Sequence, residues 1–172
     1  MRKEEDKMRK RSLFVAFSVV GVLIFLLGTV NPSPAGQTIK FHSKHINVAT
    51  KFDTVEVGDK PGHVVALFQA KGVGVRTEGP GEPPYKIEIW GTGDYQGDGT
   101  GKELGYGKFI FSDGSYYYEK WTGNVSGNRD TGTAVYYGGT GRFKGMTGGS
   151  KFDCILFGDR FICEVDGTIE LP

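Results

Sequence analysis

Two cysteines are the only side chains of this chain whose spacing predicts a covalent bond. Cys154 and Cys163 flank Gly158-Asp159, and a two-residue type II′ hairpin turn requires glycine at its first position. That turn makes the cysteines direct cross-strand partners at a non-hydrogen-bonded site, with Cα atoms about 4.5 Å apart. This separation lies at the short end of the range that a disulfide tolerates. We therefore predict a Cys154–Cys163 disulfide, with two buried free thiols as the alternative.

One carboxyl group is a weak candidate for acid–base chemistry. In the run YKIEIW, alternation along a strand puts Glu88 and Trp90 on one face and Tyr85 on the other. If the tyrosine side is the core, Glu88 is solvated. If the tryptophan side lines a cavity, Glu88 is a buried carboxyl that can act as a general acid or base. The candidate ligand contacts are Trp90, Tyr118 and Trp121.

A second glutamate receives a structural interpretation. Asp113-Gly114 is a favoured pair for a two-residue type I′ turn. This turn sets Lys108 opposite Glu119, and opposite charges on facing positions stabilise a hairpin. We therefore expect Glu119 to serve as an ion-pair partner and not as a catalytic group.

The histidines do not predict a metal centre. His42, His45 and His63 are the only three in the chain. His42 and His45 are three residues apart, which puts them on opposite faces of a strand. The chain has no Cys-x-x-Cys motif and no Cys/His cluster. We therefore predict no metal site and no cofactor.

A glycine motif of the form G-T-G-x-aromatic-x-G occurs twice, at Gly91–Gly97 and at Gly139–Gly145. A phosphate-binding loop needs a helix directly after it, and no helix is predicted after either copy. We interpret the glycines as turns or bulges that bend strands round a barrel, with the aromatic residue plugging one end.

The elements that must position these residues are β-strands. From Gln37 onward no ten-residue segment has a helical apolar pattern, and short runs of Val, Ile, Phe, Tyr and Thr alternate with Gly, Asp and Pro. Strands are expected at 38–44, 51–57, 62–77, 85–92, 104–111, 115–122, 131–137, 148–157 and 160–170. This pattern predicts an all-β fold, an antiparallel closed barrel of about eight strands, because a barrel leaves no free edge.

The first thirty-five residues form a separate segment. Residues 1–11 contain six bases and three acids, and residues 13–30 carry no charge. This apolar export helix fits either a cleaved signal peptide or a retained transmembrane anchor. Both place the predicted barrel domain, residues 36–172, outside the cytoplasm, whether periplasmic, secreted or anchored. The formal net charge of +1 excludes a chain that is drawn to nucleic acid by its overall charge.

The run AVYYGGTGRFKGMTGGSKF resembles the allene oxide cyclase and dirigent-like barrel superfamily, whose members are calycin-like in architecture. The motif residues that match are Gly139, Thr140, Gly141, Arg142, Phe143 and Gly145. The resemblance implies an eight-stranded antiparallel barrel with a mostly apolar interior. Plant members include a cyclase of an oxidised fatty acid and proteins that steer radical coupling. No catalytic residue is carried over from them.

Three functions are compatible with these observations, and the fold alone cannot choose among them. The first, which we favour, is a non-enzymatic exported barrel that binds an apolar small molecule or serves in the cell envelope. The second is a membrane-anchored accessory subunit that docks on a larger membrane complex. The third is a cofactor-free isomerase or cyclase. An open cavity with a buried carboxyl favours the enzyme, and a filled interior with an exposed apolar patch favours docking.

Overall fold

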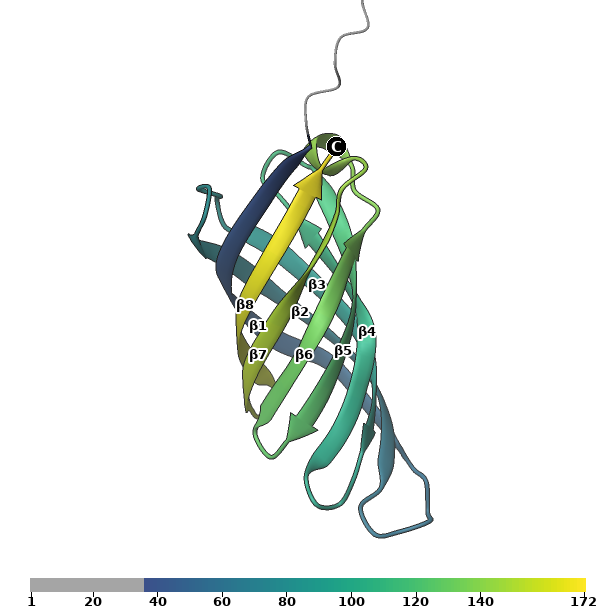
Figure 1. The fold of residues 1–172 in the computed structure, drawn as a ribbon. Helices are drawn as coiled ribbons and strands as arrows, with labels where there is room; N and C mark the ends of the chain where they lie inside the picture. The colour runs from purple at the N-terminus through teal and green to yellow at the C-terminus, as the bar shows by residue number, and fades with distance from the viewer. Residues whose placement is uncertain (1–35) are drawn as a thin grey trace, which may run out of the picture. The chain divides into compact units, whose positions relative to one another are not determined.

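The computed structural model describes residues 36–172, and the predicted export segment lies outside the described residues. Eight antiparallel strands pair in chain order, and the last pairs with the first to close a barrel (Figure 1). The elements are β1 (Gln37–Glu56), β2 (Val64–Glu78), β3 (Tyr85–Tyr95), β4 (Thr100–Ile110), β5 (Tyr116–Ser126), β6 (Arg129–Tyr137), the 3-10 helix η1 (Gly141–Phe143), β7 (Thr147–Phe157) and β8 (Arg160–Leu171). The predicted all-β barrel is confirmed. Within the described range, no helix is long and apolar enough to span a membrane.

The first strand corrects one expectation. The two strands predicted at 38–44 and 51–57 are a single strand, β1, with an irregularity between Ala49 and Lys51. At this point the Ala49 N–H donates to the Asp159 carbonyl, 2.7 Å away, in the turn that precedes β8. Beyond it, β1 pairs only with β2. Residues 51–56 are therefore all exposed, although Phe52 still packs on Phe68, and the sequence has no regular apolar alternation there that would have joined the two predicted strands.

The β4–β5 hairpin has a different turn from the predicted one. Phe111 and Ser115 are paired across a three-residue loop, with the Phe111 N–H 2.9 Å from the Ser115 carbonyl. Gly114 closes the loop with a φ of 81°, the left-handed conformation that this longer turn requires. The Asp113 side chain accepts a hydrogen bond from the Ser115 N–H at 2.9 Å. The predicted two-residue turn is therefore wrong by one residue.

This one-residue shift changes the face on which Glu119 lies. Lys108 pairs with Tyr118, and Gly107 pairs with Glu119. Because the side-chain period of a strand is two, the slip moves every side chain of β5 to the other face. Glu119 therefore points into the barrel, and the predicted Lys108–Glu119 ion pair is wrong.

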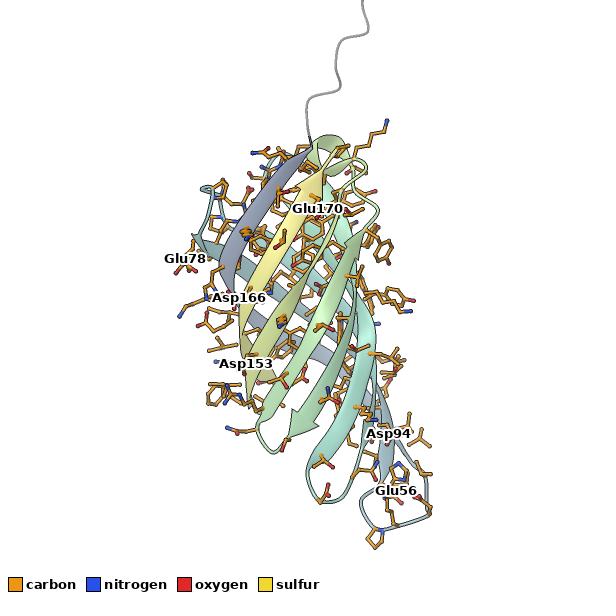
Figure 2. All side chains as sticks on the ribbon, viewed as in Figure 1. Glu56, Glu78, Asp94, Asp153, Asp166 and Glu170 are labelled. Carbon is orange, nitrogen blue, oxygen red and sulfur yellow. A yellow bond between two sulfur atoms is a disulfide. The ribbon has the colours of Figure 1, made fainter. Side chains whose placement is uncertain are left out.

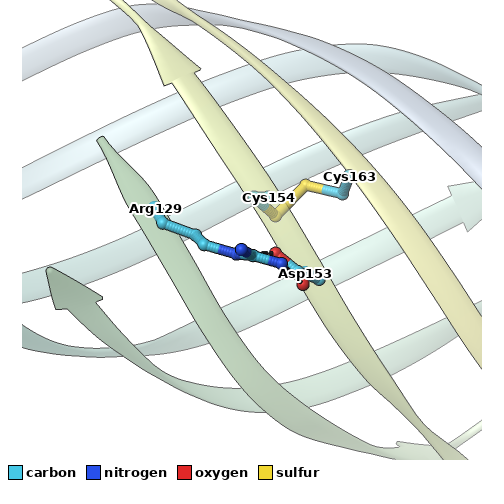
Figure 3. Close-up of a disulfide and its surroundings, with 4 residues drawn as sticks. All are labelled: Arg129, Asp153, Cys154 and Cys163. Atoms are coloured by element: carbon cyan, nitrogen blue, oxygen red, sulfur yellow. Dashed lines mark hydrogen bonds and ion pairs between the residues drawn. A yellow bond between two sulfur atoms is a disulfide. The ribbon is translucent and has the colours of Figure 1, made fainter. Parts of the chain in front are cut away.

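The β7–β8 hairpin agrees with the sequence. Gly158 has a φ of 63°, and no non-glycine residue of the described range has a positive φ, so the turn is of type II′. Cys154 and Cys163 are cross-strand partners joined by a disulfide, with Cα atoms 4.0 Å apart. Figure 3 shows this bridge between β7 and β8, near the ion pair of Arg129 and Asp153. The predicted disulfide is confirmed.

The two ends of the barrel differ. At the end where η1 lies, aromatic rings fill the interior, and Phe143 from the second glycine motif packs 4.6 Å from Phe111 and 5.1 Å from Tyr117 between ring centroids. The first copy of the motif has another role. Gly91 lies within β3, and a Cβ there would collide with the ring of Phe68. The repeated motif therefore closes one end of the barrel and makes room for rings inside it.

Candidate ligand-binding cavity

A cavity of about 290 Å³ occupies the barrel toward the other end, which we call the Gly158 end. Its lining is mainly apolar and includes Phe52, Phe68, Ile89, Trp121, Phe152 and Phe161. These side chains come from six strands, because inward positions recur at every second residue of each strand. A mostly apolar pocket with a few polar groups is the usual form of a small-molecule site.

Of the four candidate site residues, one lines the cavity and three lie on the outer face of the barrel. Trp121 lines the cavity and is 6% exposed. Glu88 and Trp90 lie on the outer face of β3, because Tyr85 on the same strand is in the core, as in the first of the two alternatives. Tyr118 lies on the outer face of β5, where its ring stacks on Tyr137 at 5.9 Å. The cavity therefore uses Trp121 alone of these four.

Three carboxyl groups that sequence reasoning did not select line the cavity: Glu103 on β4, Glu119 on β5 and Asp130 on β6. Other acidic residues, such as Glu78, Asp166 and Glu170, are on the outside of the barrel (Figure 2). Alternation relative to Trp121 would have found Glu119, since the two residues are two apart and share a face. The two-residue turn assigned to Asp113-Gly114 obscured this signal.

Glu119 is held in a desolvated setting. Gly107 faces it across the strand pair, and a Cβ at Gly107 would lie 2.7 Å from a carboxyl oxygen of Glu119, so the glycine provides the space that the carboxyl occupies. Burial raises the pKa of Glu119 to about 8. The group is therefore mostly protonated at neutral pH and can donate a proton or a hydrogen bond.

Glu103 and Asp130 are two further acidic groups of the cavity, and the charge of Asp130 acts on Glu103. Burial raises the pKa of Glu103 to about 7; a hydrogen bond from the Tyr95 hydroxyl, 2.6 Å away, opposes this rise, and the charge of Asp130 adds to it. Burial also raises the pKa of Asp130 to about 6, against a backbone hydrogen bond at Asn124. At neutral pH the cavity therefore holds carboxyl groups in different protonation states.

Several polar atoms of the cavity have no hydrogen-bond partner within the described part of the chain. They are Asn47 Oδ1, Trp121 Nε1 and Asp130 Oδ1, on side chains of residues that are 1%, 6% and 7% exposed. Buried polar groups are normally paired, and an unpaired one costs about 1–3 kcal/mol. Each of these buried atoms belongs to a residue that lines the cavity and still lacks a partner.

The inward histidine is not a cation. His45 lines the cavity, and its Nε2 lies 2.9 Å from the Tyr85 hydroxyl. Burial lowers the pKa of His45 to about 4, so the ring is neutral. His42 lies on the outside of the barrel, 2.7 Å from Asp166, so the two histidines point to opposite faces as predicted. Among residues 36–172, no group of three or more potential ligands is arranged to hold a metal ion.

Among the comparisons with known proteins, one with a solved structure supports the fold. No protein-family model and no curated protein sequence matches the chain. The conserved protein of unknown function RPA1785 from Rhodopseudomonas palustris is similar in structure, with a TM-score of 0.51 and 11% identity over 81% of this chain and 99% of that one. The pterocarpan synthase dirigent protein GePTS1 has a TM-score of 0.48 and 16% identity over 84% of this chain and 94% of that one. The eight-stranded barrel implied by the resemblance to the allene oxide cyclase and dirigent-like superfamily is confirmed as a fold.

Proposed function

We propose that this barrel binds a small, largely apolar molecule that carries at least one polar group. The observation that supports the proposal is the apolar cavity with the unpartnered atoms Trp121 Nε1 and Asp130 Oδ1 in its wall. Apolar walls supply affinity, and a few polar atoms orient the ligand. A volume of about 290 Å³ is roughly twice that of a ~150 Å³ cavity known to hold benzene. The ligand is therefore about the size of a phenylalkyl or bicyclic compound.

Filling the cavity tests this proposal. Leu156→Trp on β7 adds bulk to a lining residue, and Ile155→Trp adds it to the neighbouring outward residue, which is 46% exposed. We expect Leu156→Trp to weaken the binding of 2-phenylethanol, measured by calorimetry, at least tenfold, while Ile155→Trp leaves it unchanged. Equal binding by both variants would place the ligand outside the cavity and refute the proposal.

A cofactor-independent isomerase or cyclase is the second candidate, favoured by the interior position of Glu119. A carboxyl that is protonated at neutral pH can act as a general acid without a cofactor. The rearrangement of styrene oxide to phenylacetaldehyde needs only a proton donor and serves as a probe. We expect Glu119→Gln to abolish any acceleration while the outer-face variant Glu88→Gln retains it. No acceleration by the unaltered protein would count against catalysis of this kind.

We also propose that the barrel functions outside the cytoplasm. The Cys154–Cys163 disulfide supports this location, because disulfides persist mainly in oxidising compartments. A cytoplasm-dependent reporter fused after Pro172 should be inactive, and strong activity would contradict export.

The accessory-subunit alternative draws support from a different observation. Val73, Ile46, Ile162 and Ile155 are adjacent exposed residues in a row across β2, β1, β8 and β7. Native mass spectrometry of material from the cell envelope should retain a partner if docking is the function. The cavity in the interior favours ligand binding over docking, because a docking subunit is expected to have a filled interior.

A further inference from the structure

The charge balance inside the cavity is one-sided. Glu103, Glu119 and Asp130 contribute three acidic groups from three adjacent strands. The cavity has one lysine or arginine in its lining, Arg160, whose side chain is 72% exposed and lies 3.9 Å from the exposed carboxylate of Asp159. Because His45 is neutral, Arg160 is the only cation of the cavity lining among the described residues; Arg76, elsewhere in the barrel, lies over the Phe41 ring at 4.7 Å.

Asp130 is the clearest example of a buried acidic group with an unpartnered oxygen. The residue is 7% exposed, and its Oδ1 has no hydrogen-bond partner within residues 36–172. Gly123 stands beside it, and a Cβ there would lie 2.5 Å from the same oxygen, so the barrel wall gives room to the carboxyl, while the backbone hydrogen bond at Asn124 is the donor it supplies. An ionised carboxylate can only accept hydrogen bonds. Burying it is costly unless a cation or several donors pair with it.

Aromatic rings line the same cavity as these acids. The centroids of Phe68 and Trp121 are 6.0 Å apart, those of Phe52 and Phe68 are 6.1 Å apart, and those of Trp121 and Phe152 are 6.3 Å apart. Ring faces attract an ammonium group through the quadrupole of the ring, most strongly when water is excluded. They also stack on an apolar or aromatic ligand body.

We propose that the ligand of this cavity is a small arylalkyl or alkyl amine, bound as its ammonium ion with the nitrogen at the carboxyl groups and the apolar part against Phe68, Trp121 and Phe152. This inference rests on the binding function proposed above. An ammonium donates a hydrogen bond to the Asp130 carboxyl and supplies a positive charge, which the cavity lining has only at the exposed Arg160. A neutral alcohol of the same size would supply the same apolar part but no positive charge.

The proposal has a proton-linkage consequence. The raised pKa values of Glu119 and Glu103, about 8 and 7, show that these groups keep their protons near neutral pH when no cation is present. An ammonium favours their ionised forms, so amine binding releases protons. Amine affinity should therefore rise as the pH rises through this range, and that of a neutral ligand should not.

The experiment compares two probes of matched shape, 2-phenylethylamine and 2-phenylethanol, by calorimetry on the full chain. We expect the amine to bind at least tenfold more tightly than the alcohol near pH 8.5. Most of this difference in affinity should be lost near pH 5.5. Repeating the titration in buffers of different ionisation enthalpy should reveal proton release for the amine alone.

Variants assign the effect to the carboxyl groups. Asp130→Asn and Glu119→Gln keep the side-chain shape and should weaken amine binding while alcohol binding persists, and the outer-face variant Glu88→Gln should change neither. Alcohol binding without any preference for the amine would overturn the amine proposal and leave the binding function standing. If neither probe binds the unaltered protein, the proposed function itself fails. Proton release measured on the unaltered protein tests the inference even if a variant does not fold.

Discussion

At the scale of single residues, the carboxyl groups of the interior combine the ligand-binding role proposed for them with a cost in stability. Glu119 has a folded-state pKa of about 8, raised from 4.5 by burial. A carboxyl with a raised pKa binds more protons in the folded than in the unfolded protein. Stability is therefore fully present below the unfolded pKa of 4.5 and is lost as the pH rises through about 8.

Glu119→Gln should remove this dependence. We expect the variant to melt at a temperature several degrees higher than the unaltered protein near pH 8, with the difference vanishing near pH 4. Thermal melts followed by circular dichroism across this range measure the effect, with the outer-face variant Glu88→Gln as the control. If the melting temperatures of Glu119→Gln and of the unaltered protein change with pH in the same way, the carboxyl is solvated.

At the scale of elements, the turns set which side chains enter the barrel. Gly114 closes the β4–β5 loop with a φ of 81°. A Cβ at this position meets nothing within 4 Å, so only backbone conformation opposes a side chain there. Gly81 in the β2–β3 loop is equally open but has no positive φ, which makes it a matched control.

We therefore expect Gly114→Ala to lower the free energy of unfolding by about 1–2 kcal/mol and Gly81→Ala to leave it unchanged or slightly raised. Urea denaturation of both variants measures this difference. Equal stabilities would mean that the loop adopts another conformation, and the assignment of Glu119 to the interior would then lose its basis.

The disulfide acts on the neighbouring hairpin. Cys154 and Cys163 are nine residues apart and close a short loop, for which the chain-entropy model gives roughly 2.5 kcal/mol. We expect replacement of both cysteines by alanine to cost less, about 1–2 kcal/mol, because the Gly158 turn already restrains the loop. Denaturation of the double variant measures the loss, and thiol counting on unreduced, unfolded protein should find no free thiol. Two free thiols in protein taken from outside the cytoplasm would show that the bridge is absent.

At the scale of the whole molecule, closure of the barrel should be visible in amide exchange. Residues 42–48 of β1 pair with both β2 and β8, whereas residues 51–56 pair with β2 alone. We expect exchange measured by mass spectrometry to be slow in the first stretch and markedly faster in the second, since only the first is held on both sides. Comparable rates in the two stretches would indicate that the barrel is open between β1 and β8.

The sequence predicted correctly those features that depend on neighbouring residues alone. The alternation around Gly158-Asp159 determined the β7–β8 register, the facing cysteines and their interior position, because a glycine-first turn and a two-residue period involve only neighbouring residues. The strand pattern determined the all-β class for the same reason. Asp113-Gly114 suits both a two-residue and a three-residue turn, and only the structure chose between them, with the position of Glu119 depending on that choice.

The cavity was decided by tertiary structure alone. Glu103, Glu119 and Asp130 are on three separate strands, and no spacing in the sequence brings their carboxyl groups together. That all three residues line one cavity depends on the stagger between strands of the closed barrel, which is a property of the whole sheet. The outward position of Glu88 and Trp90 was likewise decided by packing, because the core took the face of β3 that carries Tyr85. Alternation specifies that a strand has two faces, and only burial against the other seven strands specifies which of them is inside.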